Sequence, residues 1–278
     1  MSKQMQDAQL FDFTGRVAVI TGGAGVLCSN LAKALARHGA SVAVLDINLA
    51  AAEQVAGEIQ AGGGRAVALQ ADVLNRPSLE AAAQRILEMF GRLDILVNGA
   101  GGARKEATTS PSLSFFDLPE DAVRQVFDLN FMGTFLACQV FGRHMVQAGA
   151  GCILNISSVA GLRPLTRSVA YSAAKAAVIN FTRWLAVHLS QEYSANIRVN
   201  AVAPGFFLTE QNRFLLLDEQ SGQPTPRAVR ILDHTPVGHM GHPEDLVMPA
   251  LMLLADEAGF THGAILTVDG GYDAHGGV

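Results

Sequence analysis

The chain has 278 residues, of which 49% are hydrophobic and 16% are charged. This hydrophobic fraction excludes a mainly disordered chain, and the length allows one large domain to fold without metals or disulfides. The formal net charge of −5 makes a nucleic acid or an anionic membrane a poor partner. Three cysteines without a CxxC pair predict neither a disulfide framework nor a metal site.

The N-terminal segment 1–12 is a polar tail without the apolar region of a signal peptide. The sequence also contains no run of about 18 apolar residues that would cross a membrane. We therefore expect a cytoplasmic protein, and the small number of cysteines agrees with a reducing compartment.

The sequence alternates short apolar runs with longer amphipathic stretches. In chain order, this pattern predicts strands at 16–20, 41–45, 66–69, 93–97, 151–156, 197–202 and 264–268. Helices are predicted between them, at 31–37, 50–60, 76–90, 119–147, 171–192 and 243–254. Nearly continuous apolar strands are typical of a parallel sheet that is covered on both faces. The alternation therefore predicts one α/β domain over 1–278, a doubly wound (Rossmann) parallel sheet of about seven strands with helices on both faces.

Residues 204–242 interrupt the alternation and contain four of the ten prolines. A loop-rich excursion of this length in a compact domain is typical of a binding loop. We expect this segment to form a lid over the substrate.

A glycine-rich turn follows the first predicted strand and leads into a helix. Gly23 and Gly25 fit the first two glycines of a Gly-x-Gly-x-x-Gly phosphate loop, whereas Cys28 replaces the third. Asp46 ends the second strand, where a carboxylate bonds the adenosine ribose and repels a 2′-phosphate. The pattern predicts NAD rather than NADP. The alternatives are a purely structural turn and a solvated acid at a strand end.

Tyr171 and Lys175 are four residues apart on a predicted helix and therefore lie on one face. A nearby ammonium stabilises a phenolate, so Lys175 is expected to lower the pKa of Tyr171 toward neutrality. Ser158 follows the strand at 151–156, at the sheet edge where ligands bind. A solvent-exposed Tyr–Lys pair is the alternative for these two residues.

These motifs, in this order and at this spacing, resemble the short-chain dehydrogenases/reductases over about residues 13–272. The resemblance also includes the segments 97–101 and 204–205 and the ending at 268–271. It implies a catalytic tetrad of Asn130, Ser158, Tyr171 and Lys175. It further implies cofactor contacts from Gly22, Gly25, Val26, Leu27, Asp46, Asp72, Val73, Asn98, Ala100, Gly101, Tyr171, Lys175, Pro204, Gly205, Phe207 and Thr209.

The family resemblance implies hydride transfer between nicotinamide and an alcohol carbon, with Tyr171 as the acid–base group. Ser158 would polarise the substrate oxygen, Lys175 would bond the nicotinamide ribose, and Asn130 would hold a water. The sequence departs from the family pattern at Val26 and Cys28, where glycines are usual, and at Gly99, where asparagine is usual. Cys28 is expected to be a buried, inert residue, and the alternative is a thiol of lowered pKa at a helix start.

Several arginines are predicted near the active edge of the sheet. Guanidinium groups bind carboxylates bidentately, so in an acidic protein they indicate a carboxylated substrate. The alternative is that they are solvated or paired with local acids. The predicted substrate-binding residues are Arg104, Arg163, Arg167 and Arg213.

Within the family, the loops around these arginines resemble members that act on sugar acids, and they imply interconversion of D-mannonate and D-fructuronate with NAD. The alternatives are a gluconate 5-dehydrogenase-like or polyol dehydrogenase, a 3-oxoacyl thioester reductase, and a non-enzymatic NAD-binding protein. Excess apolar residues on the two long helices, such as Phe135, Phe181 and Trp184, predict a homotetramer or homodimer, although core packing explains them nearly as well.

Overall fold

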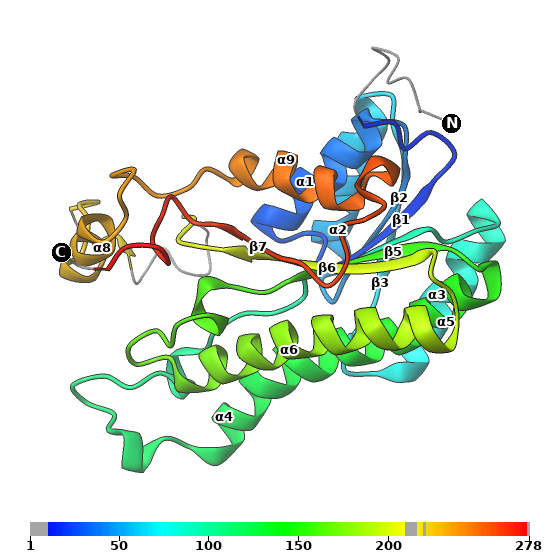
Figure 1. Cartoon of the computed structure of the whole chain (residues 1–278). Coiled ribbons are helices and arrows are strands. Elements are labelled where there is room, and N and C mark those ends of the chain that lie inside the picture. Colours follow the sequence, from blue (N-terminus) through cyan, green and yellow to red (C-terminus); the bar gives the residue numbers. More distant parts are fainter. Residues whose placement is uncertain (1–10, 209–215, 219–220, 277–278) are drawn as a thin grey trace.

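The computed structural model describes residues 11–208, 216–218 and 221–276, and these contain a sheet of seven parallel strands (Figure 1). The spatial order of the strands is β3-β2-β1-β4-β5-β6-β7. It reverses between β1 and β4, and sheets of this kind bind ligands at such a crevice. The strands are β1 Val17–Thr21, β2 Ser41–Asp46, β3 Arg65–Gln70, β4 Ile95–Asn98, β5 Gly151–Ile156, β6 Ile197–Pro204 and β7 Ile265–Val268.

Helices cover both faces of the sheet, as predicted. One apolar core joins the sheet to α1, α2 and α9, and a second core joins its other face to α3, α5 and α6 (Figure 1). β1, β4 and β6 are buried along their whole length, which explains their continuous apolar sequences. The helices are α1 Val26–Arg37, α2 Leu49–Ala61, α3 Arg76–Phe90, α4 Glu120–Phe127, α5 Gly133–Ala148, α6 Val169–Glu192, α8 Pro226–Asp233 and α9 Val247–Leu254.

Local sequence explains where several helices begin. Asn48 caps α2 and Asn75 caps α3, each by accepting a hydrogen bond from a backbone amide three residues ahead at 3.2 Å. α1 differs from the prediction because it begins at Val26, directly after the glycine turn, rather than at residue 31. The early start brings the first-turn amides of α1 to the carboxyl edge of the sheet.

The helical region predicted at 119–147 is divided into three parts. α4 and α5 are separated by a π-helical turn, Asp128–Met132, with Asn130 at its centre. The spacing of the apolar residues does not reveal this turn, because a single inserted residue barely changes a 3.6-residue pattern. π-Helical turns inside α-helices are frequent at functional sites.

The segment 204–242 contains α8 in addition to loops, and it returns to the sheet edge where Phe207 forms a bridge with Gly241. No helix among the described residues has both the length and the apolar character needed to span a bilayer.

Candidate active site

The turn after β1 lies against the turn after β4, because Thr21 and Asn98 pair at the ends of these strands. Gly22 has a φ of +60°, and a Cβ at this position would lie 2.7 Å from the Cα of Ala100. Glycine meets both constraints without strain. Together with the start of α1, these turns enclose a cavity of about 460 Å³ at the crevice of the sheet.

The chemistry of this cavity suits a dinucleotide. The first-turn amides of α1 have no acceptors within the helix, so they are available to an anionic group placed at the glycine turn. Asp46 lines the cavity at the end of β2, and its carboxylate accepts hydrogen bonds from the amides of Ala24 at 3.1 Å and Asn48 at 3.0 Å. These two bonds fix the carboxylate where ribose hydroxyls would need an acceptor.

Most of the predicted cofactor residues surround this one cavity. Pro204 ends β6 at the same edge of the sheet and Gly205 follows it, whereas Thr209 lies outside the described residues. The predicted residues that line the cavity are Gly22, Gly25, Val26, Leu27, Asp46, Asp72, Val73, Ala100 and Gly101.

The side chains of two residues predicted to contact the cofactor, Asn98 and Phe207, are not among those that line the cavity. The Asn98 side chain is buried in the sheet, where its Nδ2 donates to Asn155 Oδ1 at 2.9 Å and joins β4 to β5. The Phe207 ring is buried in the core against Gly241, at which a Cβ would lie 2.6 Å from the ring. Both side chains therefore pack the sheet and its edge instead of facing the cavity.

The cavity also has walls that sequence reasoning missed. Each missed residue is adjacent in sequence to a predicted site residue or ends a predicted strand, and this position could have identified it. These residues are Ala24, Ile47, Ala71, Leu129 and Ile156.

The four residues expected to be catalytic lie together beside the cavity. Gly101 packs between two of them, because a Cβ there would lie 2.5 Å from Asn130 Oδ1 and 3.3 Å from Lys175 Nζ. Lys175 Nζ donates at 2.8 Å to the carbonyl of Ile156, which lines the cavity. The same ammonium lies 5.7 Å from the centroid of the Tyr171 ring, and the Ser158 side chain acts on the Tyr171 hydroxyl so as to lower its pKa.

Asn130 is held by the π-helical turn and by the loop after β4. Its Nδ2 donates at 2.8 Å to the carbonyls of both Gly102 and Val126, and its Oδ1 accepts from the Gly102 amide at 3.1 Å. These bonds fix the buried amide and tie the turn after β4 to the helix region behind it.

The predicted effect of Lys175 on Tyr171 is corrected by the structure. Burial raises the pKa of Tyr171 above its ordinary value, and the hydrogen bond with Ser158 opposes this rise. Burial also lowers the pKa of Lys175 to about 8. The ammonium bonds the Ile156 carbonyl, and the pKa of the phenol is raised rather than lowered.

Cys28 is buried, and burial raises the pKa of its thiol to about 12. This agrees with the expectation of an inert residue and is opposite to the alternative of a lowered pKa. Its Sγ lies against Gly99, where a Cβ would overlap it.

The predicted substrate arginines do not form one group. Arg104 is exposed and donates to Gln125 Oε1 at 2.7 Å. Arg163 forms an ion pair at 3.0 Å with Asp273, an acid of the C-terminal segment that the sequence did not single out. Arg167 has no side-chain hydrogen bond or ion pair among the described residues, and Arg213 lies outside them.

The comparisons with known proteins agree with this site. A family profile described as short chain dehydrogenase matches residues 16–220. The chain belongs to this family. This match confirms the predicted family and the predicted class of oxidoreductases acting on CH–OH groups. The cofactor NAD is confirmed by the relatives below that were crystallised with NAD or NADH.

Relatives match this short-chain dehydrogenase over nearly its whole length. UxuB of Bacillus subtilis (strain 168), an uncharacterized oxidoreductase, is 47% identical over 96% of this chain and 98% of its own. A crystal structure from Haemophilus influenzae with bound NAD, proposed to be a D-mannonate oxidoreductase, is 43% identical with a TM-score of 0.90 over 96% of this chain and 98% of that one. A 7α-hydroxysteroid dehydrogenase complexed with NADH and 7-oxo glycochenodeoxycholic acid is 35% identical with a TM-score of 0.83, covering 94% of this chain and 95% of that one.

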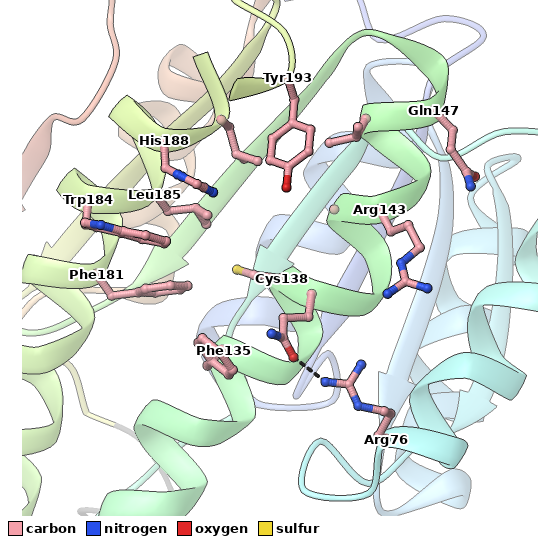
Figure 2. Close-up of a pocket in the computed structure, with 14 residues that line it drawn as sticks. Arg76, Phe135, Cys138, Arg143, Gln147, Phe181, Trp184, Leu185, His188 and Tyr193 are labelled. Atoms are coloured by element: carbon pink, nitrogen blue, oxygen red, sulfur yellow. Dashed lines mark hydrogen bonds between the residues drawn. The ribbon is translucent and has the colours of Figure 1, made fainter. Parts of the chain in front are cut away.

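A second concavity of about 570 Å³ lies away from the tetrad, between the outer faces of α5 and α6 in this short-chain dehydrogenase (Figure 2). Phe181, Trp184 and His188 project from α6 toward Phe135 and Cys138 of α5 (Figure 2). The lining is mostly apolar, and no residue of the tetrad belongs to it. This outer groove is therefore a surface feature distinct from the active site.

Proposed function

We propose that this NAD-dependent oxidoreductase interconverts the secondary alcohol and the ketone of a sugar acid, with D-mannonate and D-fructuronate as the pair. The observation that carries the proposal is Arg167, a guanidinium without a side-chain partner among the described residues, in the loop that leads into Tyr171. A carboxylate is the group that a guanidinium binds best. The NAD-bound relative from Haemophilus influenzae, itself proposed to act on D-mannonate, supports the same substrate.

The proposed mechanism assigns one task to each residue of the tetrad. When bound, NAD accepts or supplies the hydride. Tyr171 takes the hydroxyl proton during oxidation and returns it during reduction, and Ser158 donates a hydrogen bond to the substrate oxygen. Lys175 bonds the nicotinamide ribose, and Asn130 holds a water that links Lys175 to solvent.

The raised pKa of Tyr171 supports one direction of this chemistry. A phenol that keeps its proton at neutral pH is ready to donate that proton to a ketone oxygen. We therefore assign ketone reduction as the favoured direction near pH 7. Oxidation requires the phenolate and is expected to accelerate as the pH rises.

Tyr171→Phe tests the acid–base assignment. The variant removes the hydroxyl and leaves the ring, so we expect NADH binding, measured by fluorescence, to be retained. Turnover should fall by at least about 10²-fold, since acid–base help is typically worth about 10² to 10⁴ in rate. Turnover equal to that of the wild type would refute the role of Tyr171.

Asp46 supports selection of NAD over NADP. Its carboxylate is fixed at the cavity wall by two backbone amides and would repel a 2′-phosphate. Asp46→Ala is expected to narrow the preference for NAD, measured as the ratio of kcat/KM values for NADH and NADPH. An unchanged ratio would show that the preference has another origin.

A substrate panel tests the proposed sugar acid. NADH oxidation is compared among D-fructuronate, 5-ketogluconate, D-fructose and a 3-oxoacyl thioester. The highest kcat/KM is expected for D-fructuronate. A higher value for 5-ketogluconate, for the neutral ketose or for the thioester would replace the proposed substrate with a gluconate, polyol or acyl substrate, respectively.

The lid and the chain organisation belong to the same proposal. We assign 204–242 as a substrate lid on a single domain, because the segment leaves the sheet at Pro204 beside Ser158, whose Oγ donates to the Pro204 carbonyl at 3.5 Å. Substrate contacts from Arg104, Arg163 and Arg213 remain predictions.

A cytoplasmic location is supported by three buried cysteines, all of them free thiols.

We further propose that the outer groove between α5 and α6 is covered by a second copy of the chain in a homodimer or homotetramer. Trp184 is 54% exposed and stacks on His188 at 4.6 Å between ring centroids, within a row of rings that continues to Tyr193 (Figure 2). Large exposed apolar patches mark interaction sites on soluble proteins. Phe141, another large apolar residue of α5, is fully buried, so packing in the core of the single chain accounts for it.

A further inference from the structure

Arg227 is a cation that sequence reasoning overlooked. It is half-buried at the start of α8, and Thr225 caps this helix by accepting a hydrogen bond from the Ala228 amide at 3.2 Å. Among the described residues, no acidic side chain pairs with Arg227, and its guanidinium has no hydrogen bond. A half-buried guanidinium without an anion has lost part of its hydration without compensation.

The loop before Tyr171 supplies a second arginine, Arg167, which is exposed and also has no ion pair among the described residues. Within the described ranges, Arg167 is the one residue other than glycine with a positive φ, at +71°. This conformation is disfavoured for a long side chain, and such backbone strain concentrates at ligand sites. The carbonyl of Arg167 accepts a hydrogen bond from the Thr109 amide at 3.0 Å, which holds the turn.

The loop that carries Arg167 meets α8 at the C-terminal segment. Arg163 of that loop donates to the His275 carbonyl at 3.3 Å, and the His275 ring packs edge-on against His234, the C-cap residue of α8, with the ring centroids 5.8 Å apart. Arg167 and Arg230 act on Arg227 electrostatically and help burial to lower its pKa, whereas Tyr272 raises it. Two like charges held close together repel each other, so an anion placed between them is strongly favoured.

The same neighbourhood lies beside the reacting end of the site. Tyr272 packs edge-on against Phe206 with the ring centroids 5.0 Å apart. Phe206 follows Pro204 and Gly205 at the end of β6, and it packs against the buried face of α8 formed by Ala228 and Ile231. The start of α8 therefore stands over the segment that leaves the sheet next to Ser158.

Arg163, in the same loop as Arg167, is already paired with its own neighbours. Its Nε pairs with Asp273 at 3.0 Å, and its Nη1 donates to the His275 carbonyl at 3.3 Å. These contacts neutralise Arg163 and fasten the loop before Tyr171 to the C-terminal segment. Arg167 and Arg227, in contrast, have no acidic partner among the described residues.

We propose that Arg227, together with Arg167, forms the site that binds the carboxylate of the substrate and so makes the enzyme selective for sugar acids over neutral sugars. This inference rests on the proposed function and adds to it the residue that recognises the anionic end of the substrate. In a ketohexuronate, the carboxylate and the carbonyl lie toward opposite ends of the chain. An anion site on α8 and in the loop before Tyr171 thus anchors one end while Ser158 and Tyr171 meet the other.

The test compares Arg227→Gln with Arg230→Gln on D-fructuronate and D-fructose, which differ in bearing a carboxylate or a hydroxymethyl group. Arg230 is an exposed arginine on the same helix, so its variant removes an equal charge. We expect Arg227→Gln to raise the KM for D-fructuronate by about 10- to 100-fold, the range for a lost charged hydrogen bond, with little change in kcat. The KM for D-fructose and the affinity for NADH should stay unchanged, and Arg230→Gln should change each value by less than about threefold.

Arg227→Lys and Arg167→Gln separate geometry from charge. A lysine keeps the positive charge but lacks the planar fork, so the KM for D-fructuronate should be intermediate. If both arginines bind one carboxylate, the double Gln variant should lose less than the product of the single losses. The proposed carboxylate site would be contradicted if Arg230→Gln raised the KM for D-fructuronate as much as Arg227→Gln does. It would also be contradicted if Arg227→Gln raised the KM for D-fructuronate and D-fructose equally.

A binding measurement distinguishes failure of this inference from failure of the proposed function. The rise in melting temperature caused by D-mannonate is measured on the NADH-bound wild type and on Arg227→Gln, and it should be lost in the variant. If the wild type reduces D-fructose better than D-fructuronate, the proposed function is wrong. If the wild type prefers D-fructuronate and the variant keeps both its KM and its thermal response, the function stands and the role of Arg227 is wrong.

Discussion

Cys28 and Gly99 show how two departures from a family pattern can have one cause. In sequence they are separate: a thiol where glycine is usual, and a glycine where asparagine is usual. In the structure the two turns touch, and a Cβ at position 99 would overlap Cys28 Sγ. The larger residue in one turn is accommodated by the smaller residue in the other, so the close packing at the cavity wall is retained.

This compensation can be measured as a coupling free energy. Gly99→Ala is expected to destabilise the protein by about 1–3 kcal/mol, the usual cost of overpacking. Adding Cys28→Ala, which removes the sulfur and keeps the Cβ, should recover most of this loss. Recovery stays incomplete because the Thr21 carbonyl would still lie 2.9 Å from the new methyl group. Urea unfolding of the two single variants and the double variant gives the coupling, and strict additivity would contradict the compensation.

Lys175 gives a second prediction at the residue scale. Burial lowers its pKa from 10.5 to about 8, so the folded protein releases this proton before the unfolded chain does. Between about pH 8 and 10.5, the unfolded state binds more protons at this group, and its contribution to stability therefore rises with pH. The three buried thiols have raised pKa values and act in the opposite direction above about pH 9.

Comparison with Lys175→Met isolates the lysine from the thiols, which both proteins share. The difference in unfolding free energy, wild type minus variant, should increase from pH 8 to pH 10 in the ligand-free enzyme. Urea unfolding at a series of pH values measures it. A difference that is constant or decreases with pH would show that the ammonium is not desolvated.

At the scale of elements, β6 and α9 are joined by one buried cation. Arg198 of β6 donates to the last carbonyls of α9, those of Leu253 and Ala255 at 2.8 Å and that of Leu254 at 3.2 Å. These carbonyls receive no hydrogen bond from an amide inside the helix. The positive guanidinium also lies at the negative end of the helix dipole. Arg198 thus serves as the C-terminal cap of α9 and holds this helix on the sheet.

Arg198→Met should lower the free energy of unfolding by about 2–4 kcal/mol, because the buried carbonyls lose a charged donor. The KM for NADH should stay unchanged, since Arg198 does not line the cavity of the dinucleotide. Arg85→Met is the matched control, because Arg85 is exposed and, within the part of the chain that the structure describes, its one ion pair is with Glu88 on its own helix. The control should change stability by less than about 1 kcal/mol. Equal losses in the two variants would refute the capping role.

The sequence predicts most of these elements because burial on both faces leaves a continuous apolar signal in each parallel strand. The strand at 151–156 is found at its predicted bounds, and the helix at 76–90 is bounded by a capping asparagine and a glycine. The π-helical turn around Asn130 is missed because it preserves the apolar spacing of one long helix. Arg227 is missed for a different reason: its significance depends on which loops meet in space, and local patterns carry no such information.

At the scale of the whole molecule, the outer groove is the feature that a single chain does not explain. A row of rings along α6, from Phe181 through Trp184 and His188 to Tyr193, faces the outer side of α5 (Figure 2). Trp184 and Tyr193 of this row are 54% and 58% exposed, and exposed rings gain free energy when another apolar surface covers them. A second copy of this chain presents the same rings, and a twofold axis would pair the two grooves.

Trp184→Glu tests this arrangement without touching the active site. The charge would be buried unpaired in a twofold contact, so we expect the assembly to dissociate into a smaller species at micromolar concentration. Sedimentation velocity or light scattering after gel filtration measures the mass of each species. Met89→Glu, which places the same charge at an exposed apolar residue near the end of α3, should leave the mass unchanged. A wild-type protein that is monomeric, or a Trp184→Glu variant with the wild-type mass, would show that the groove is not the contact between copies.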